Sequence, residues 1–122
     1  MSLGRAGRLK VIQPTEEPLM PTLVVQYRTK PDCADENQRL VEKVFAELDE
    51  VNATGFAYAS LRLEDGVSFV HVVVEEDGAS SVSLADLPAF REFQAGIADR
   101  CEEQPVARAA TVVGAHRIFH AD

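Results

Sequence analysis

Apolar residues recur at every second position in several stretches of the chain, and this alternation is typical of β-strands. It predicts strands over Thr22–Arg28, Phe56–Leu63 and Val67–Glu75, which are rich in Val, Leu, Tyr and Phe. We expect a fourth strand over Ala109–Phe119. Four short strands in about 100 residues indicate one small sheet.

Two other segments carry apolar residues at helical spacing. A first helix is predicted over Ala34–Asn52, and its apolar stripe comprises Leu40, Val41, Val44, Phe45 and Leu48. A second is predicted over Pro88–Glu103 and ends at Gln104-Pro105; its apolar face comprises Phe90, Phe93, Ile97 and Cys101. Just before it, Ser83-Leu84-Ala85-Asp86 has the spacing of a capping box, with Asp where Glu is usual.

The order of these elements predicts the fold. Asp65-Gly66 lies between the second and third strands and is a strong signal for a tight hairpin. The order is therefore β-α-β-β-α-β, which is that of the ferredoxin-like fold. We expect an α+β domain with one antiparallel four-stranded sheet and both helices on one face.

The alternation divides the strand residues between two faces of the sheet. One set is aliphatic or small apart from a single tyrosine, and we expect it beneath the helices: Leu23, Val25, Tyr27, Ala57, Ala59, Leu61, Val70, Val72 and Val74. The other set mixes polar and apolar residues: Val24, Gln26, Arg28, Phe56, Tyr58, Ser60, Arg62, Phe69, His71 and Val73. A face this apolar would be a large sticky patch if it were exposed. We therefore expect a homodimer in which two such faces enclose a partly polar pocket.

Residues 20–122 form the single predicted domain, and residues 1–19 differ from it in composition. In one interpretation Met20 is the natural start and the preceding residues have little importance. In the other, residues 8–13 form an extra edge strand or an arm exchanged in a dimer.

Composition excludes several classes of function. The chain has 122 residues and a formal net charge of -8, which argues against binding to nucleic acid or to anionic membranes. No apolar run reaches the roughly 20 residues needed to span a bilayer, and no signal peptide is expected. Cys33 and Cys101 form no CxxC pair, so a reduced, cytoplasmic protein is the simpler expectation.

Met20 to Phe119 resembles the dimeric α+β barrel superfamily, and most nearly its antibiotic-biosynthesis-monooxygenase-like branch. The resemblance rests on the start Met-Pro-Thr-Leu-Val-Val-Gln-Tyr, the length of the first helix, the Asp65-Gly66 hairpin and the segment Leu-Pro-Ala-Phe-Arg-Glu-Phe-Gln at 87–94. It implies a homodimer with a pocket in each half. Some members oxidise aromatic polyketides or quinols without metal or flavin, whereas others degrade haem, isomerise or dehydrate small molecules. No catalytic residue of the family carries over to this chain.

The mixed face offers three candidate catalytic residues. His71 lies in mid-strand and could act as a base near neutral pH, with Tyr58 and Arg62 stabilising an enolate. Alternatively, His71 is hydrogen-bonded across the dimer interface, Tyr58 packs there, and Arg62 pairs with an acidic residue across it.

Four further residues of this face are candidate ligand contacts: Gln26, Arg28, Ser60 and Phe69. Arg28 could instead form an ion pair across the interface. No metal site is expected, because His116 and His120 are about 13 Å apart in a strand. No glycine-rich phosphate loop is present either, and no cofactor is expected.

Three functions remain open from the sequence. The first is a cofactor-independent, monooxygenase-like oxidoreductase acting on a small aromatic or carbonyl compound. The second is a small-molecule-binding module without turnover, and the third is a structural dimer with no cavity. Haem degradation is a weaker fourth option that would need His71 as the axial ligand.

Overall fold

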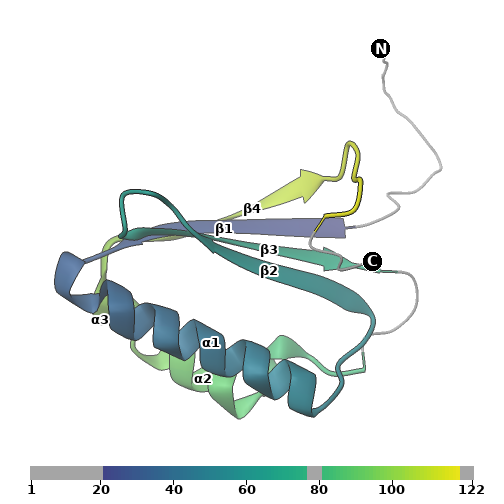
Figure 1. The fold of residues 1–122 in the computed structure, drawn as a ribbon, viewed down its shortest axis with the longest axis horizontal. Helices are drawn as coiled ribbons and strands as arrows, with labels where there is room; N and C mark the ends of the chain where they lie inside the picture. Colours follow the sequence, from purple (N-terminus) through teal and green to yellow (C-terminus); the bar gives the residue numbers. More distant parts are fainter. Residues whose placement is uncertain (1–20, 77–80, 119–122) are drawn as a thin grey trace.

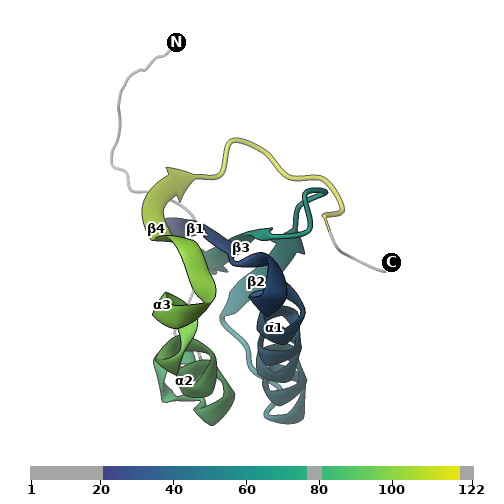
Figure 2. The ribbon, with the colours of Figure 1, turned by 90° about the vertical axis from the view of Figure 1, so that its left-hand side faces the viewer.

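The computed structural model describes residues 21–76 and 81–118, and its architecture is the predicted one. Four strands form one antiparallel sheet in the order β2-β3-β1-β4. The helices cover one face of this sheet, as Figures 1 and 2 show. The ferredoxin-like α+β fold expected from the element order is therefore confirmed. The predicted extension, residues 1–19, lies outside the described residues.

The first half of the chain follows the hydrophobic pattern closely. Strand β1 spans Pro21–Thr29 and leads through a short 3-10 helix, η2 (Pro31–Cys33), into helix α1, Ala34–Glu50. Helix α1 buries Ala34, Asn37, Val41, Val44 and Leu48. It ends where Asn52 takes a positive φ of 53°, a conformation that asparagine tolerates better than most residues.

Strands β2 (Phe56–Arg62) and β3 (Ser68–Glu75) form the predicted hairpin. Gly66 has a φ of 79°, which glycine adopts without steric cost. The Asp65 carboxylate accepts hydrogen bonds from the backbone nitrogens of Val67 and Ser68 and from the Ser68 hydroxyl. These bonds hold the pKa of Asp65 below its ordinary value.

The second half differs from expectation in three ways. The predicted capping box forms a 3-10 helix, η3 (Leu84–Asp86), without a side-chain cap. Helix α2 is shorter, Pro88–Ala95, and it is capped from α1, since Glu47 accepts the backbone N–H of Ala89 at 2.8 Å. Gly96 then separates α2 from helix α3, Ile97–Arg100.

The predicted position of the last strand is wrong. Strand β4 spans Cys101–Thr111 and begins inside the predicted second helix. It contains Pro105, which the sequence pattern treats as a break. The proline is tolerated because β4 is an edge strand and its register with β1 shifts between Gln26 and Arg28, a bulge where a missing N–H costs little.

The face assignment is right for β1 and wrong for β2 and β3. Val25 lies opposite His71, and His71 lies opposite Ser60, so these residues share a face. Tyr27, Phe69 and His71 are all buried beneath the helices. Both alternating sets of β3 are mostly apolar, with His71 the polar exception, so the pattern alone does not decide which one faces the core. The bulkier set fills the space below the sheet.

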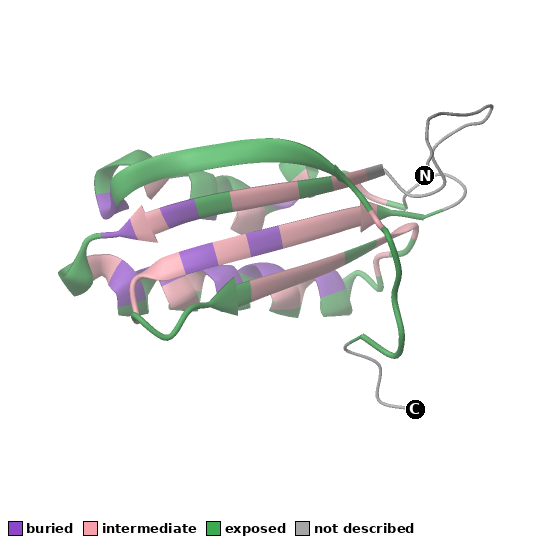
Figure 3. Cartoon of the chain, turned by 90° about the horizontal axis from the view of Figure 1, so that it is seen from above, coloured by how far each residue is buried: buried purple, intermediate pink, exposed green. Residues whose placement is uncertain are grey.

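The opposite surface, which we call the open face, is therefore mainly aliphatic. It carries Val24, Ala57, Ala59, Leu61, Val70, Val72, Val74 and Val106, together with the polar Gln26 and Arg108. Figure 3 looks down on it with the helices behind the sheet. Leu61 and Val106 keep 41% and 51% of their surface exposed. This much exposed apolar surface on one side of a sheet is unusual for a protein that stays monomeric.

Candidate functional site

A histidine lies at the centre of the layer between sheet and helices. His71 projects from the middle of β3, and only 4% of its surface is exposed. The rings of Tyr27, Tyr58 and Phe93 surround its imidazole, with centroids 5.3, 5.9 and 5.6 Å away. Strands β1 and β2 bring the two tyrosines, and α2 brings the phenylalanine.

Both ring nitrogens of His71 have a tyrosine hydroxyl as partner. Nδ1 lies 2.8 Å from the Tyr58 hydroxyl, and Nε2 lies 2.8 Å from the Tyr27 hydroxyl. The Ser60 hydroxyl is 3.4 Å from Nε2, a longer and weaker approach. A polar ring this deep in the core is therefore satisfied on both sides.

The polar contacts continue from Tyr27 into the helices. Asn37, on α1, donates its amide N–H to the Tyr27 hydroxyl at 2.8 Å. Arg100, at the end of α3, donates from Nε to Asn37 Oδ1 at 3.0 Å and from Nη2 to the Phe93 carbonyl at 2.7 Å. Asn37 is fully buried, and Arg100 is 6% exposed. We call the five residues Arg100, Asn37, Tyr27, His71 and Tyr58 the buried relay.

Burial controls the charge of these groups. It lowers the pKa of His71 to about 4, so the imidazole is neutral at neutral pH. It also raises the pKa of Tyr27 and Tyr58 well above the ordinary value, so both hydroxyls keep their protons. At neutral pH the relay therefore contains one charge, on Arg100, at the end opposite Tyr58.

A pocket of about 300 Å³ opens beside His71, and we call it the inner pocket. Its walls are mostly apolar and come from β1, η3, α2, α3 and β4: Leu23, Val25, Leu84, Phe90, Phe93, Ile97, Pro105 and Ala107. Tyr27, Tyr58, His71 and Gln94 supply the polar groups. An apolar enclosure with a few convergent hydrogen-bonding groups is the usual form of a small-molecule site.

A larger hollow of about 520 Å³ adjoins this pocket and shares Val73 and Leu84 with it. It is lined chiefly by Ser81–Asp86 and by Glu75, next to residues outside the described ranges. It holds none of the relay residues. We therefore regard the smaller pocket as the candidate site.

The structure brings together three of the residues that the sequence singled out. His71, Tyr58 and Ser60 converge as described above. Phe69 lies next to them but belongs to the core, stacked on Tyr27 with centroids 5.5 Å apart and 2% of its surface exposed. Tyr58 itself stacks on Phe45 of α1 at 4.8 Å.

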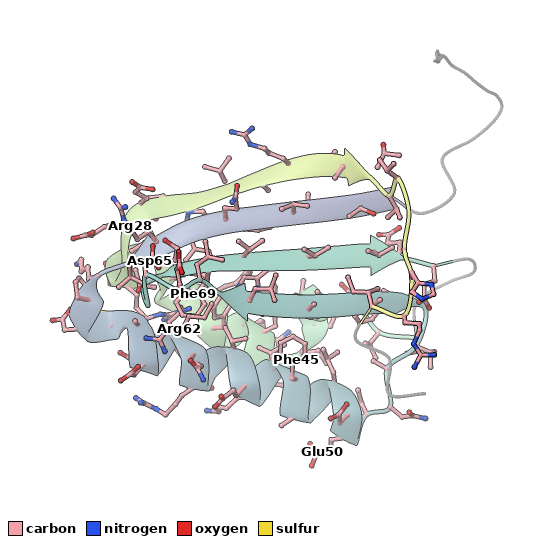
Figure 4. All side chains as sticks on the ribbon, turned by 45° about the horizontal axis from the view of Figure 1, so that its top comes forward. Arg28, Phe45, Glu50, Arg62, Asp65 and Phe69 are labelled. Atoms are coloured by element: carbon pink, nitrogen blue, oxygen red, sulfur yellow. The ribbon has the colours of Figure 1, made fainter. Side chains whose placement is uncertain are left out.

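The other three predicted residues lie elsewhere. The Arg62 guanidinium donates to the Gly66 carbonyl and to Gln38, and it forms an ion pair with Asp35 at 3.1 Å. Arg28 is paired with Glu103 at 2.6 Å within the same chain, and Gln26 is exposed on the open face. Figure 4 shows Arg28 and Arg62 near Asp65, toward the hairpin end of the sheet. None of the three lines the inner pocket.

Sequence reasoning missed Asn37 and Arg100, and it treated Tyr27 as ordinary core. A signal for the first two exists. Asn37 is one helical turn before Val41 on the apolar stripe of α1, and Arg100 follows Ile97 by three residues on the apolar face of the last helical segment. A polar residue on an apolar stripe needs a partner, which would have pointed to a buried network.

No group of three or more His, Cys, Asp or Glu residues suited to a metal occurs within 21–76 and 81–118. His116 is exposed, and His120 lies outside those ranges. Cys33 and Cys101 are free thiols. Among the described helices, none has the length and apolarity needed to cross a bilayer.

Solved structures of other proteins share this fold at low sequence identity. A candidate antibiotic biosynthesis monooxygenase from Nitrosomonas europaea has a TM-score of 0.65 and 12% identity, over 80% of this chain and 93% of that one. SnoaB, a cofactor-independent oxygenase from Streptomyces nogalater, has a TM-score of 0.58 and 16% identity, over 80% and 96%. A candidate antibiotic biosynthesis monooxygenase from Caulobacter crescentus has a TM-score of 0.61 and 19% identity, over 80% and 92%.

No protein-family model matches the sequence, and no curated protein matches it. The likeness is therefore one of fold, and it agrees with the resemblance of Met20 to Phe119 noted from the sequence. The chain has the ferredoxin-like fold of the antibiotic-biosynthesis-monooxygenase-like proteins.

Proposed function

We propose that the protein is a cofactor-independent, monooxygenase-like enzyme acting on a small aromatic or carbonyl compound in the inner pocket. One observation carries the proposal: a neutral, buried His71 and its two tyrosine partners line a pocket whose other walls are apolar except for Gln94. The fold shared with a cofactor-independent oxygenase supports it. A flat ring would pack against Phe90 and Phe93, with its oxygen toward Tyr58.

The proposed reaction needs no bound redox group. The substrate loses a proton from a carbon or hydroxyl that its own carbonyl or ring makes acidic, and the resulting anion transfers its electrons to O₂. One oxygen atom enters the substrate and the other leaves as water, with all four electrons coming from the substrate. The protein has to provide a base, a hydrogen bond to the anion and a pocket that excludes water.

His71 is the proposed base and Tyr58 the proposed donor to the enolate oxygen. His71 on its own is a weak base, because burial lowers its pKa to about 4. A substrate anion beside the imidazole favours its charged form and raises that pKa, so the base strengthens as the reaction proceeds. Arg62 is held at the hairpin by Gly66 and Asp35, and it has no role in this proposal.

Oxygen consumption tests the proposal. With a panel of oxygen-sensitive ring compounds such as anthrone and 1,4-dihydroxynaphthalene, we expect at least one to be oxidised with O₂ uptake above the spontaneous rate. His71→Gln should then lower kcat/KM by about 100-fold, the usual contribution of a general base. His116→Gln, the same replacement at an exposed histidine, should leave the rate unchanged. Full activity in His71→Gln would rule out the base.

A binding module without turnover is the second candidate. It is favoured by one observation, that both nitrogens of His71 already have a tyrosine partner in the empty pocket. A compound that raises the melting temperature and is recovered unchanged in the presence of O₂ would favour this alternative. A cavity of about 300 Å³ is too small for a porphyrin, so we do not propose haem degradation.

We also propose that the chain forms a homodimer through the open face and acts in the cytoplasm. A second copy would cover Val70, Val72 and Val74, which lie on the open face and are not covered by any helix of their own chain. The sequence argument for a dimer used a mixed set of residues from β1, β2 and β3, of which only those of β1 lie on the open face. The open face supports the same conclusion more directly, since most of its side chains are aliphatic and only a few, such as Gln26 and Arg108, are polar.

A further inference from the structure

The hydrogen bonds of the buried relay have defined donors and acceptors, and Arg100 determines them. Arginine can only donate hydrogen bonds. Arg100 Nε donates to the side-chain oxygen of Asn37, so the Asn37 amide nitrogen must face Tyr27. Asn37 can therefore only donate to the Tyr27 hydroxyl, at 2.8 Å. The orientation of one amide follows from the charge of its neighbour.

Tyr27 and His71 then have two possible arrangements. In the first, Tyr27 donates its hydroxyl hydrogen to Nε2 of His71, which makes Nδ1 the protonated nitrogen. In the second, Nε2–H donates to Tyr27, and the Tyr27 hydrogen has no acceptor among the described side chains. Tyr27 also lines the pocket, but only 5% of its surface is exposed, so water or a ligand reaches it less readily than the half-buried Tyr58. A buried donor without a partner destabilises the fold. The first arrangement is therefore favoured.

Matching donors with acceptors in the same way shows which partner the Tyr58 hydroxyl hydrogen can have. In the favoured arrangement the Nδ1–H of His71 donates to the Tyr58 oxygen, so the Tyr58 hydroxyl hydrogen is not used within the relay. Tyr58 is half-buried and lines the inner pocket, where a ligand or water can accept that hydrogen. The unpaired donor is thus placed where a partner can reach it.

We propose that Asn37 and Arg100 are positioning residues that hold His71 as its Nδ1–H tautomer and so present the Tyr58 hydroxyl to the pocket as a hydrogen-bond donor. The ligand group that fits is an uncharged or enolate oxygen, such as a ring ketone. A carboxylate fits poorly, because the pocket contains no cation. This ligand class rests on the proposed function, whereas the tautomer does not.

The packing around Arg100 keeps the first member of the relay in place. Its guanidinium lies 5.4 Å from the centroid of the Phe93 ring and donates to the Phe93 carbonyl. A Cβ on Gly96 would lie 2.9 Å from Nη1, so only glycine leaves room for the side chain as it stands. The break between α2 and α3 therefore accommodates the arginine that orients the relay.

The tautomer can be measured in the ligand-free protein. With ¹⁵N-labelled histidine at pH 7, we expect the NMR resonances of His71 to show a protonated Nδ1 and an unprotonated Nε2. A protonated Nε2 with an unprotonated Nδ1, or rapid averaging of the two forms, would overturn the proposal. The result does not depend on turnover, so it can fail or succeed separately from the proposed function.

Asn37→Asp tests the direction of the relay with almost no change in shape. A carboxylate paired with Arg100 accepts where the amide nitrogen donated, so Tyr27 should donate to Asp and accept from Nε2–H of His71. The tautomer should reverse while the fold is retained. Asn52→Asp, the same replacement at an exposed helix end, should leave the tautomer unchanged. An Asn37→Asp variant that keeps the wild-type tautomer would contradict the role of Asn37.

Two small probes test the presented hydroxyl. Acetophenone has a carbonyl oxygen, and ethylbenzene has nearly the same shape without it. We expect NMR titration to give about fivefold tighter binding of acetophenone, the effect of one neutral hydrogen bond. Tyr58→Phe should abolish this preference and retain ethylbenzene binding. A preference that survives in Tyr58→Phe would show that another group binds the oxygen.

Discussion

At the scale of the residue, His71 makes the stability of the protein depend on pH. Burial lowers its pKa from 6.5 to about 4 in the folded state. As the pH falls below about 6.5, the unfolded chain takes up this proton while the folded one does not, so protons favour unfolding. The stability is fully present above that pH and is lost progressively down to about pH 4.

We therefore expect the folded protein to lose about 2 kcal/mol between pH 7 and pH 5 through this one group. The free energy of unfolding in urea, measured at both pH values and one protein concentration, gives the difference. Carboxylates titrate in the same range, so the contribution of His71 is the part that disappears in His71→Gln. His116→Gln should keep the wild-type pH dependence. Equal pH dependence in His71→Gln and the wild type would show that His71 is not held neutral.

The sequence predicted some of these residues and not others, for a physical reason. His71, Tyr58 and Ser60 are close in space because they lie on adjacent paired strands, and alternation reveals that relation. Asn37 and Arg100 reach the same site from α1 and α3, so their contact depends on how the helices pack. Alternation along a strand contains no information about that packing.

At the scale of the element, Gly96 has little room for a side chain. It ends α2 and begins α3, and an added Cβ would meet the Arg100 guanidinium at 2.9 Å. We expect Gly96→Ala to lower the melting temperature by several degrees, corresponding to about 1 kcal/mol from displaced hydrogen bonds. Gly114→Ala is the matched control, because nothing lies within 4 Å of its added Cβ. Equal melting temperatures for the two variants would show that Arg100 moves aside freely.

Strand β4 shows why the last element was the hardest to predict. Its first half, Cys-Glu-Glu-Gln-Pro, has neither alternation nor strand-forming residues. It is a strand because β1 offers an unpaired edge and α3 ends beside it, with the Lys30 backbone N–H donating to the Arg100 carbonyl at 2.8 Å. Pairing with β1 outweighs the low strand propensity of this segment. The sequence alone does not reveal that the segment lies next to β1.

At the scale of the whole molecule, the element order was enough to predict the fold, whereas the two faces of the sheet were not. Strand β3 carries apolar residues on both sides, so the sequence indicates a sheet buried on both faces without saying which face meets the helices. The proposed dimer follows from the apolar residues on both faces of β3. The location of the pocket depends on which of these faces meets the helices, and that is known only from the structure.

A charge on the open face tests the dimer. Val72 lies near the centre of this face, between Val24 of β1 and Ala59 of β2. We expect Val72→Lys to convert the dimer to a monomer in light scattering coupled to size-exclusion chromatography, since a buried charge at an interface is costly. Val51→Lys, at an exposed valine after α1, should remain dimeric. A monomeric wild-type protein would contradict the proposal.

The location of the inner pocket beneath the sheet has a further consequence. The pocket lies on the helix side of the sheet, and the open face lies on the other side of the same sheet. In the proposed dimer, assembly and ligand recognition would therefore use separate surfaces of the same four strands. Substitutions on one surface can accumulate without disturbing the other, so the stoichiometry of the complex and the chemistry of its ligand are free to diverge independently.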